Sequence, residues 1–214
     1  HKYTISTQLG EISLNCSTLA RYGSQRFAKT LTNATNLMSL SLINCKFHPD
    51  FLGQIGELLA LRKVVLRMES WKGLHLETFL KKCPRLSHME ISFPSSARHG
   101  DVEETLEVIP CILSSLPGLN TMHVSVGVGC DFRANDDTLK AICDALKSCK
   151  AFNRLILTGI KMNTQRGIDI IRTCQGTSVR ILALTACFRP EEDLTELRQL
   201  RDEVNNGKKM VVEC

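Results

Sequence analysis

The chain has 214 residues, of which 43% are hydrophobic and 23% are charged, and its formal net charge is +5. This composition predicts an ordinary folded protein and excludes a largely disordered one. The mild positive charge is too small for the signature of a nucleic-acid-binding protein, and the longest apolar runs are too short for a membrane-spanning helix. We therefore expect neither a nucleic-acid partner nor a membrane span.

One sequence pattern recurs along the whole chain: an apolar residue, two others, an apolar residue, one other, and a third apolar residue. It is clearest at residues 37–47, which read LMSLSLINCKF, or LxxLxLxxCxF as a template. Full copies begin at Leu9, Leu37, Leu61, Leu86, Leu119, Phe152 and Val179. A final half-copy holds Met210 and Val212. The register predicts a single domain over residues 1–214, with about seven full repeats and a terminal half-repeat.

Each repeat is expected to contain one strand and one helix. The alternation within LxL is the two-residue period of a strand with one buried face, and such short strands must stack on their neighbours into a parallel sheet. Between the strands, apolar residues return at helical spacing. These helical stretches lie at 27–31, 51–59, 76–80, 106–113, 139–146, 168–171 and 194–200. Asn135 and Asn163 stand where helices should begin, as capping residues. The predicted fold class is therefore α/β.

The template LxxLxLxxCxF matches the leucine-rich-repeat consensus. Residues 27–66 and 136–184 resemble ribonuclease-inhibitor-type leucine-rich repeats. This resemblance implies a horseshoe-shaped solenoid, with a concave parallel sheet inside and helices outside. In animals, such repeats commonly form the C-terminal part of NOD-like receptors. The likeness implies a non-catalytic, protein-binding domain with a ligand-sensing or autoinhibitory role in cytoplasmic innate immunity.

Two other functions stay open. Residues 79–86, FLKKCPRL, resemble the cysteine-containing repeat of F-box adaptors, which implies recruitment of substrates to a ubiquitin ligase. A free-standing inhibitor of an enzyme is the third alternative. The chain begins at His1 with neither an initiator Met nor an apolar signal segment, which favours a fragment of a longer protein over a secreted protein whose signal peptide has been removed.

The sequence offers no motif for catalysis, a cofactor or a metal. It has no GxSxG elbow and no Walker A loop, and the lone Gly-Val-Gly at 127–129 lacks the surroundings of a dinucleotide site. The histidines do not pair at the i, i+4 spacing of helical metal ligands. We therefore expect no enzyme activity and no bound cofactor.

The ten cysteines include no CxxC pair. Several of them occupy equivalent repeat positions, where a buried thiol acts as a small hydrophobic group. These are Cys83, Cys149 and Cys174 near helix ends and Cys45 and Cys187 after strands. The cysteines therefore favour a structural role and a reducing compartment, the cytoplasm.

The side chains between the buried leucines should point into the concave face, where they are mostly small and polar and include no aromatic residue. The most distinctive group on this face is a loose basic stripe across adjacent strands. The stripe consists of Lys63, Arg67, His88, His123 and Arg154. It suits a protein partner with an acidic surface, although a solvated sheet without a partner is the alternative.

A second candidate surface is the rim of the sheet. Insertions at 95–100 and 127–133 follow the C-terminal ends of neighbouring strands, so they should gather on one rim, where repeat proteins often bind partners. The alternative is that the two insertions have no function and only reflect variation in loop length, which costs little stability. The candidate rim residues are Trp71, Arg98, His99, Asp131, Phe132 and Arg133. Because the concave face is plain, the rim is the favoured binding surface.

Overall fold

The computed structural model describes residues 10–15, 18–68, 73–127, 130–189, 192–207 and 210–214. Within these ranges, strands and helices alternate along the chain, and the strands form one sheet. All strand pairs are parallel, and the order of the strands in the sheet is their order in the chain. The protein is therefore an α/β protein with an arrangement compatible with a repeat solenoid.

The strands occupy the predicted positions in every repeat. They are β1 (Glu11–Asn15), β2 (Ser39–Cys45), β3 (Lys63–Met68), β4 (His88–Phe93), β5 (Thr121–Val126), β6 (Arg154–Thr158), β7 (Ile181–Thr185) and β8 (Val211–Glu213). The helices are α1 (Arg21–Thr32), α2 (Phe51–Gln54), α3 (Gly73–Lys81), α4 (His99–Ser115), α5 (Asp136–Ser148), α6 (Thr164–Gln175) and α7 (Thr195–Asn206).

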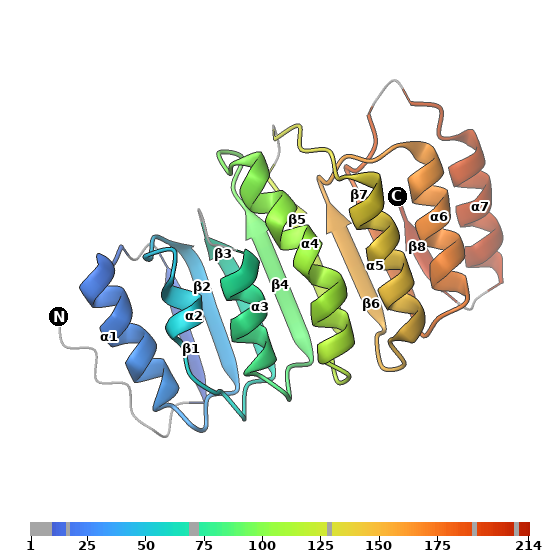
Figure 1. Cartoon of the computed structure of the whole chain (residues 1–214). Coiled ribbons are helices and arrows are strands. Elements are labelled where there is room, and N and C mark those ends of the chain that lie inside the picture. Colours follow the sequence, from blue (N-terminus) through green and yellow to red (C-terminus); the bar gives the residue numbers. More distant parts are fainter. Residues whose placement is uncertain (1–9, 16–17, 69–72, 128–129, 190–191, 208–209) are drawn as a thin grey trace.

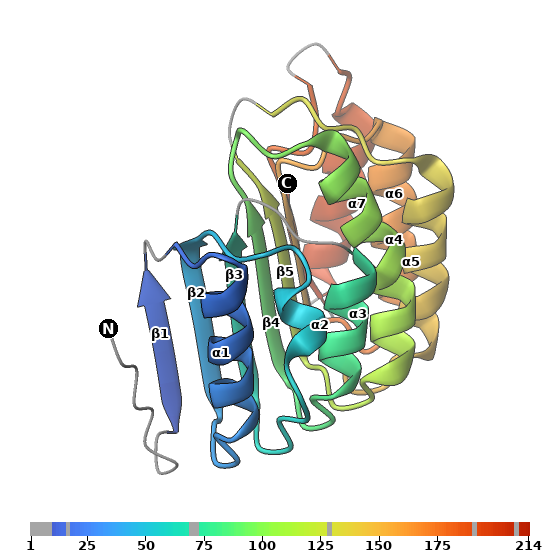
Figure 2. The same ribbon diagram turned by 60° about the vertical axis from the view of Figure 1, so that its left-hand side comes forward.

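The molecule has two layers (Figures 1 and 2). The helices cover one face of the sheet, and the other face, which we call the open face, carries no helix from the described part of the chain. This open face is the one that the sequence predicts to be concave. In the view of Figure 1, the turns that lead from helices into strands lie along the lower edge of the sheet. The loops that leave the strands lie along the upper edge, which is the predicted rim.

The core lies between the two layers. Leu40 and Leu42 of β2 are completely buried, and the register places Leu40 beside Val64 and Leu42 beside Leu66. Because successive side chains of a strand point to opposite faces, these residues meet the helices while their neighbours point to the open face. The same pairing repeats across the sheet, so the core runs without interruption through the repeats.

The second repeat departs from the predicted helix at 51–59. Helix α2 spans only Phe51–Gln54, and Ile55 already has an extended backbone. Two contacts explain the early end. The backbone N–H of Gly56 donates a hydrogen bond to the Thr32 hydroxyl over 2.7 Å, and a Cβ on Gly56 would lie 2.3 Å from Cγ2 of Thr32. The glycine therefore lets the chain lie directly against α1, where a larger residue would meet the Thr32 side chain.

Asn135 and Asn163 cap helices as predicted. The side-chain oxygen of Asn135 accepts a hydrogen bond from the backbone N–H of Asp137 over 2.9 Å, and that of Asn163 accepts one from Arg166 over 2.9 Å. These bonds satisfy N–H groups that have no partner inside the helix. The caps fix where α5 and α6 begin.

The two insertions meet on the upper edge, as predicted. The N–H of Gly127 donates to the carbonyl of Phe93 over 2.9 Å, and a Cβ on Gly127 would lie 2.5 Å from the backbone nitrogen of Ser95. Further along, the rings of His99 and Phe132 meet edge to face with centroids 5.8 Å apart. His99 belongs to the first turn of α4 and not to a loop, which corrects one detail of the prediction.

Gly127→Ala is expected to destabilise the protein by about 1–3 kcal/mol, because the new methyl group has no space beside the backbone of Ser95. Urea unfolding measures the change. Gly100→Ala is the matched control, since nothing lies within 4 Å of a Cβ there, and helix propensity predicts a gain of up to about 1 kcal/mol. Equal effects of the two substitutions would show that the loops do not pack as described.

Candidate binding site on the open face

The register arranges the side chains of the open face in rows that cross the strands. In the first row, Lys63, His88, Thr121 and Arg154 occupy neighbouring positions on β3, β4, β5 and β6. The second row holds Val65, Glu90, His123 and Ile156, and the third holds Arg67, Ser92, Ser125 and Thr158. Adjacent strands lie about 4.8 Å apart, so side chains in a row are within reach of each other.

A pocket of about 200 Å³ lies between the first two rows. Its lining residues are Lys63, Val64, His88, Met89, Glu90, Thr121, His123, Arg154 and Ile156. We call it the open-face pocket. Four of the five residues of the predicted basic stripe line it. The structure therefore brings most of the stripe together in one hollow.

Arg67, the fifth residue of the stripe, is engaged elsewhere. Its Nη2 atom lies 2.5 Å and its Nε atom 3.0 Å from Oε1 of Glu90. The ion pair runs diagonally, from the third row on β3 to the second row on β4. Glu90 neutralises Arg67, so Arg67 adds no uncompensated charge to the open face.

His123 contributes a neutral imidazole to the pocket. Burial lowers the pKa of His123 below 6.5, and the positive charges of Arg67 and Arg154 lower it further, while Glu90 acts in the opposite direction. Its Nε2 atom lies 3.4 Å from the hydroxyl oxygen of Thr158. At neutral pH, His123 is therefore a polar group and not a cation, so the predicted basic stripe has one positive charge fewer than expected.

Lys63 and Arg154 carry the remaining positive charge. Both side chains are exposed, and neither forms an ion pair or a side-chain hydrogen bond within the described ranges. His88 lies beside Lys63 in the same row, with its Nδ1 atom 2.8 Å from the hydroxyl oxygen of Ser87. The open-face pocket thus has a cation on either side and polar groups between them.

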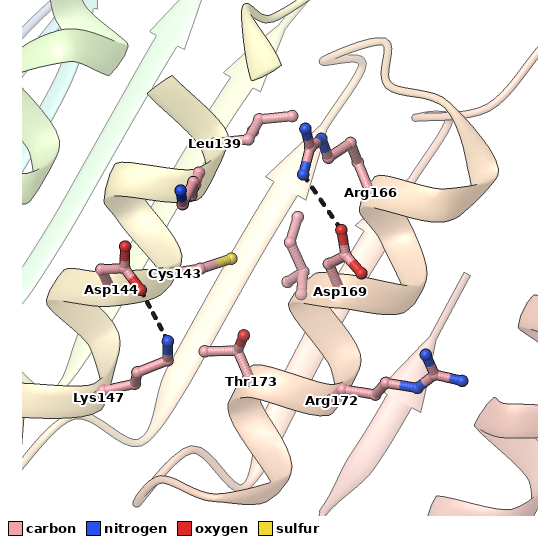
Figure 3. A pocket seen from close by; sticks show the side chains of 10 residues that line it. Leu139, Cys143, Asp144, Lys147, Arg166, Asp169, Arg172 and Thr173 are labelled. Atoms are coloured by element: carbon pink, nitrogen blue, oxygen red, sulfur yellow. Dashed lines mark hydrogen bonds and ion pairs between the residues drawn. The ribbon is translucent and has the colours of Figure 1, made fainter. Parts of the chain in front are cut away.

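A second groove, of about 330 Å³, lies on the helix side between α5 and α6 (Figure 3). Most of its charged groups form ion pairs, and Lys140 forms none within the described ranges. Lys147 and Asp144 are 2.7 Å apart, and Arg166 lies 3.2 Å from both Asp136 and Asp169.

The sulfur of Cys143 points from α5 into this helix-side groove (Figure 3). Burial raises the pKa of the Cys143 thiol, so it is not a ready nucleophile at neutral pH. The groove has one cation without an ion pair in the described ranges, Lys140, and the open-face pocket has two, so the groove is less suited to an acidic partner.

The rim residues differ in exposure. Arg98, His99 and Arg133 are exposed, and so is Asp131, whose carboxylate lies 3.5 Å from the guanidinium of Arg189. Phe132, in contrast, is only 3% exposed and packs inside the rim, so it offers no contact surface. Trp71 lies outside the described residues. The rim is therefore a polar edge over a buried phenylalanine.

The nine cysteines in the described ranges are free thiols. Burial raises the pKa of Cys83 and of Cys174 to about 12 and that of Cys187 to about 11. These repeat-position thiols are packed in the core, and Cys45 is buried with them. Within the same ranges, no group of three His, Cys, Asp or Glu side chains is placed to hold a metal ion. No helix there is long and apolar enough to cross a membrane.

The sequence matches no protein-family model and no curated protein. The description of the fold therefore rests on the geometry: eight parallel strands in chain order, alternating with helices within the described ranges. The choice of the open-face pocket as the candidate site depends on its two cations, Lys63 and Arg154.

His123 predicts a pH dependence of stability. Because its pKa is lowered in the folded protein, the unfolded chain binds a proton first as the pH falls. The stabilisation is present above pH 6.5 and is lost as the pH falls through the lowered pKa. His123→Gln should remove this contribution, so the wild type should lose more stability than the variant between about pH 7.5 and about pH 5. Urea unfolding of both proteins at both pH values measures it, and parallel losses would contradict it.

Proposed function

We propose that this chain is a leucine-rich-repeat domain of the ribonuclease-inhibitor type that binds a protein partner without chemistry. Three observations support the proposal: the LxxLxL repeat in the sequence, the parallel strands in chain order, and a sheet face that no helix covers. Rigid repeats with one open face are suited to extended binding surfaces.

The observation that carries the proposal is the pair of uncompensated cations, Lys63 and Arg154, on the two sides of the open-face pocket. Charged side chains without a partner suit the acidic side chains of another protein, because complementary charge speeds association and selects the partner. Thr121 and His88 lie between the cations in the same row and add hydrogen-bonding groups.

The resemblance to NOD-like receptors extends this proposal. On that basis, the domain holds an upstream nucleotide-binding module in a closed state in the cytoplasm. An acidic partner bound to the open face would shift the equilibrium of the receptor from this closed state to an active state, provided that it binds the active state more tightly.

Charge reversal tests the binding site. The double variant Lys63→Glu, Arg154→Glu should bind a short glutamate-rich peptide at least about tenfold more weakly than the wild type, because attraction becomes repulsion. Fluorescence anisotropy of the labelled peptide at low salt measures the affinity, and binding should weaken as salt increases.

The matched control is the double variant Lys140→Glu, Arg172→Glu, which changes the net charge equally on the helix side. It should bind the peptide almost as well as the wild type. If both double variants lose affinity equally, the net charge of the protein and not the open face attracts the peptide, and the proposed site is wrong.

The F-box alternative is supported by Cys83, which is fully buried in the turn between α3 and β4. The sequence encoded upstream of His1 distinguishes this alternative from the receptor. A GxxxxGK[ST] loop is expected there for the receptor, because it holds nucleotide phosphates. A short helical F-box segment would instead favour the adaptor. A signal peptide directly ahead of the repeats would contradict both alternatives and the cytoplasmic location.

A further inference from the structure

The last strand of the sheet, β8, has an outer edge with backbone groups that β7 does not use. Strand β8 pairs with β7 on one side, and no strand of the described chain lies beyond it (Figure 1). The N–H of Val211 donates to the carbonyl of Arg180 over 2.7 Å, so Val211 bonds toward β7. Successive residues of a strand in a parallel sheet bond to opposite neighbours, so the N–H and C=O of Val212 point to the outer edge.

The side chain of Asn205 covers this outer edge. Asn205 lies in the last turn of α7, which packs against β8. Its Oδ1 accepts a hydrogen bond from the N–H of Val212 over 2.7 Å, and its Nδ2 donates to the carbonyl of Val212 over 3.2 Å. A carboxamide offers a donor and an acceptor, as a peptide group does. The Asn205 side chain therefore takes the place that the backbone of a further strand would take.

The two bonds belong to Asn205 and not to asparagine at this helix end in general. Asn206, the next residue of α7, is exposed, and its side chain forms no hydrogen bond within the described ranges. A strand edge without such a cover presents unpaired N–H and C=O groups to the strands of other molecules. The contact between Asn205 and Val212 therefore indicates a pairing surface that is kept closed.

A second copy of the same edge matches the groups that Asn205 engages. At a hydrogen-bonded position of an antiparallel pair, two opposite residues exchange both of their N–H···O=C bonds. Two copies related by a two-fold axis can meet in this way with Val212 opposite Val212. This pairing places the exposed Val211 of each copy opposite the exposed Glu213 of the other. Another molecule of this protein is therefore a partner that replaces both bonds of Asn205.

We propose that the outer edge of β8 is a pairing surface for a second copy of this chain and that Asn205 holds it closed. While the carboxamide binds Val212, the protein does not associate through β8. When the carboxamide is removed, two β8 edges pair in antiparallel orientation. This surface lies at the end of the sheet, away from the open-face pocket, so the proposal does not depend on the proposed function.

Sedimentation equilibrium of Asn205→Ala tests the proposal. Measurements run from about 10 μM to about 1 mM, in a reducing buffer that keeps the exposed Cys214 from forming disulfides. The wild type should remain a 23.9 kDa monomer, and the variant should form dimers with a Kd below about 1 mM. Asn206→Ala is the matched control and should stay monomeric. If Asn205→Ala associates no more strongly than the wild type or the control, the proposal is wrong.

Charge at position 211 tests the register of the dimer. In the Asn205→Ala background, Val211→Glu places a like charge opposite Glu213 at two symmetric positions, and Val211→Lys places an opposite charge there. The Val211→Glu protein should dimerise at least about tenfold more weakly than the Val211→Lys protein. Val211 is 51% exposed, so both substitutions should leave the fold intact.

The net charge of the protein acts against this expected order. The chain already carries a formal charge of +5, so Val211→Lys increases the repulsion between two copies. A stronger dimer of Val211→Lys is therefore evidence for the pairing itself. Equal affinities, or a stronger dimer of Val211→Glu, would show that the copies do not meet through antiparallel β8 edges and would overturn the proposal.

Hydrogen exchange in dilute solution shows whether the edge opens while the strand stays in place. In monomeric Asn205→Ala, the amide of Val212 should exchange at least about tenfold faster than in the wild type, because its acceptor is gone. The amide of Val211 should stay protected by the carbonyl of Arg180. If both amides lose protection equally, Asn205 anchors β8 to the sheet rather than closing its edge, and the proposal is wrong.

Discussion

Parallel pairing, in a register that is kept at the two buried positions of each LxL motif, is the constraint on which the rest of this structure depends. A short strand cannot satisfy its backbone hydrogen bonds alone, so each strand requires its neighbours. Because the register does not slip at the repeat positions, Leu40, Val64, Met89 and Met122 lie side by side under the helices. The same register places the intervening side chains in rows on the open face. The same pairing pattern thus determines both the packing of the core and the arrangement of the candidate site.

The rows explain why charge on the open face is arranged in two ways. Arg67 and Glu90, one row apart on neighbouring strands, pair and leave a neutral patch. Where a row contains only cations and polar residues, as in Lys63, His88 and Arg154, the charge stays uncompensated. A few charged residues therefore decide whether a part of the open face is neutral or carries uncompensated positive charge.

The sequence predicts the strands, the caps at Asn135 and Asn163 and the meeting of the two insertions, because each follows from local pattern and from the parallel topology. It does not predict that α2 ends after one turn, since that depends on Thr32 in the preceding repeat. It also misses the diagonal pair of Arg67 with Glu90 and the burial of Phe132. Each of these is a contact between repeats whose distance no single repeat encodes.

The single turn of α2 has a consequence for the cooperativity of the whole protein. Each helix packs on the sheet and also on the helices before and after it, so the outer layer helps to transmit stability from repeat to repeat. At α2 this layer is reduced to four residues, and the three stacked rings of Phe27, Phe47 and Phe51 provide much of the link. The first repeat is therefore coupled to the others through the pairing of β1 with β2 and, in the outer layer, through this aromatic cluster, so we expect local unfolding to begin here.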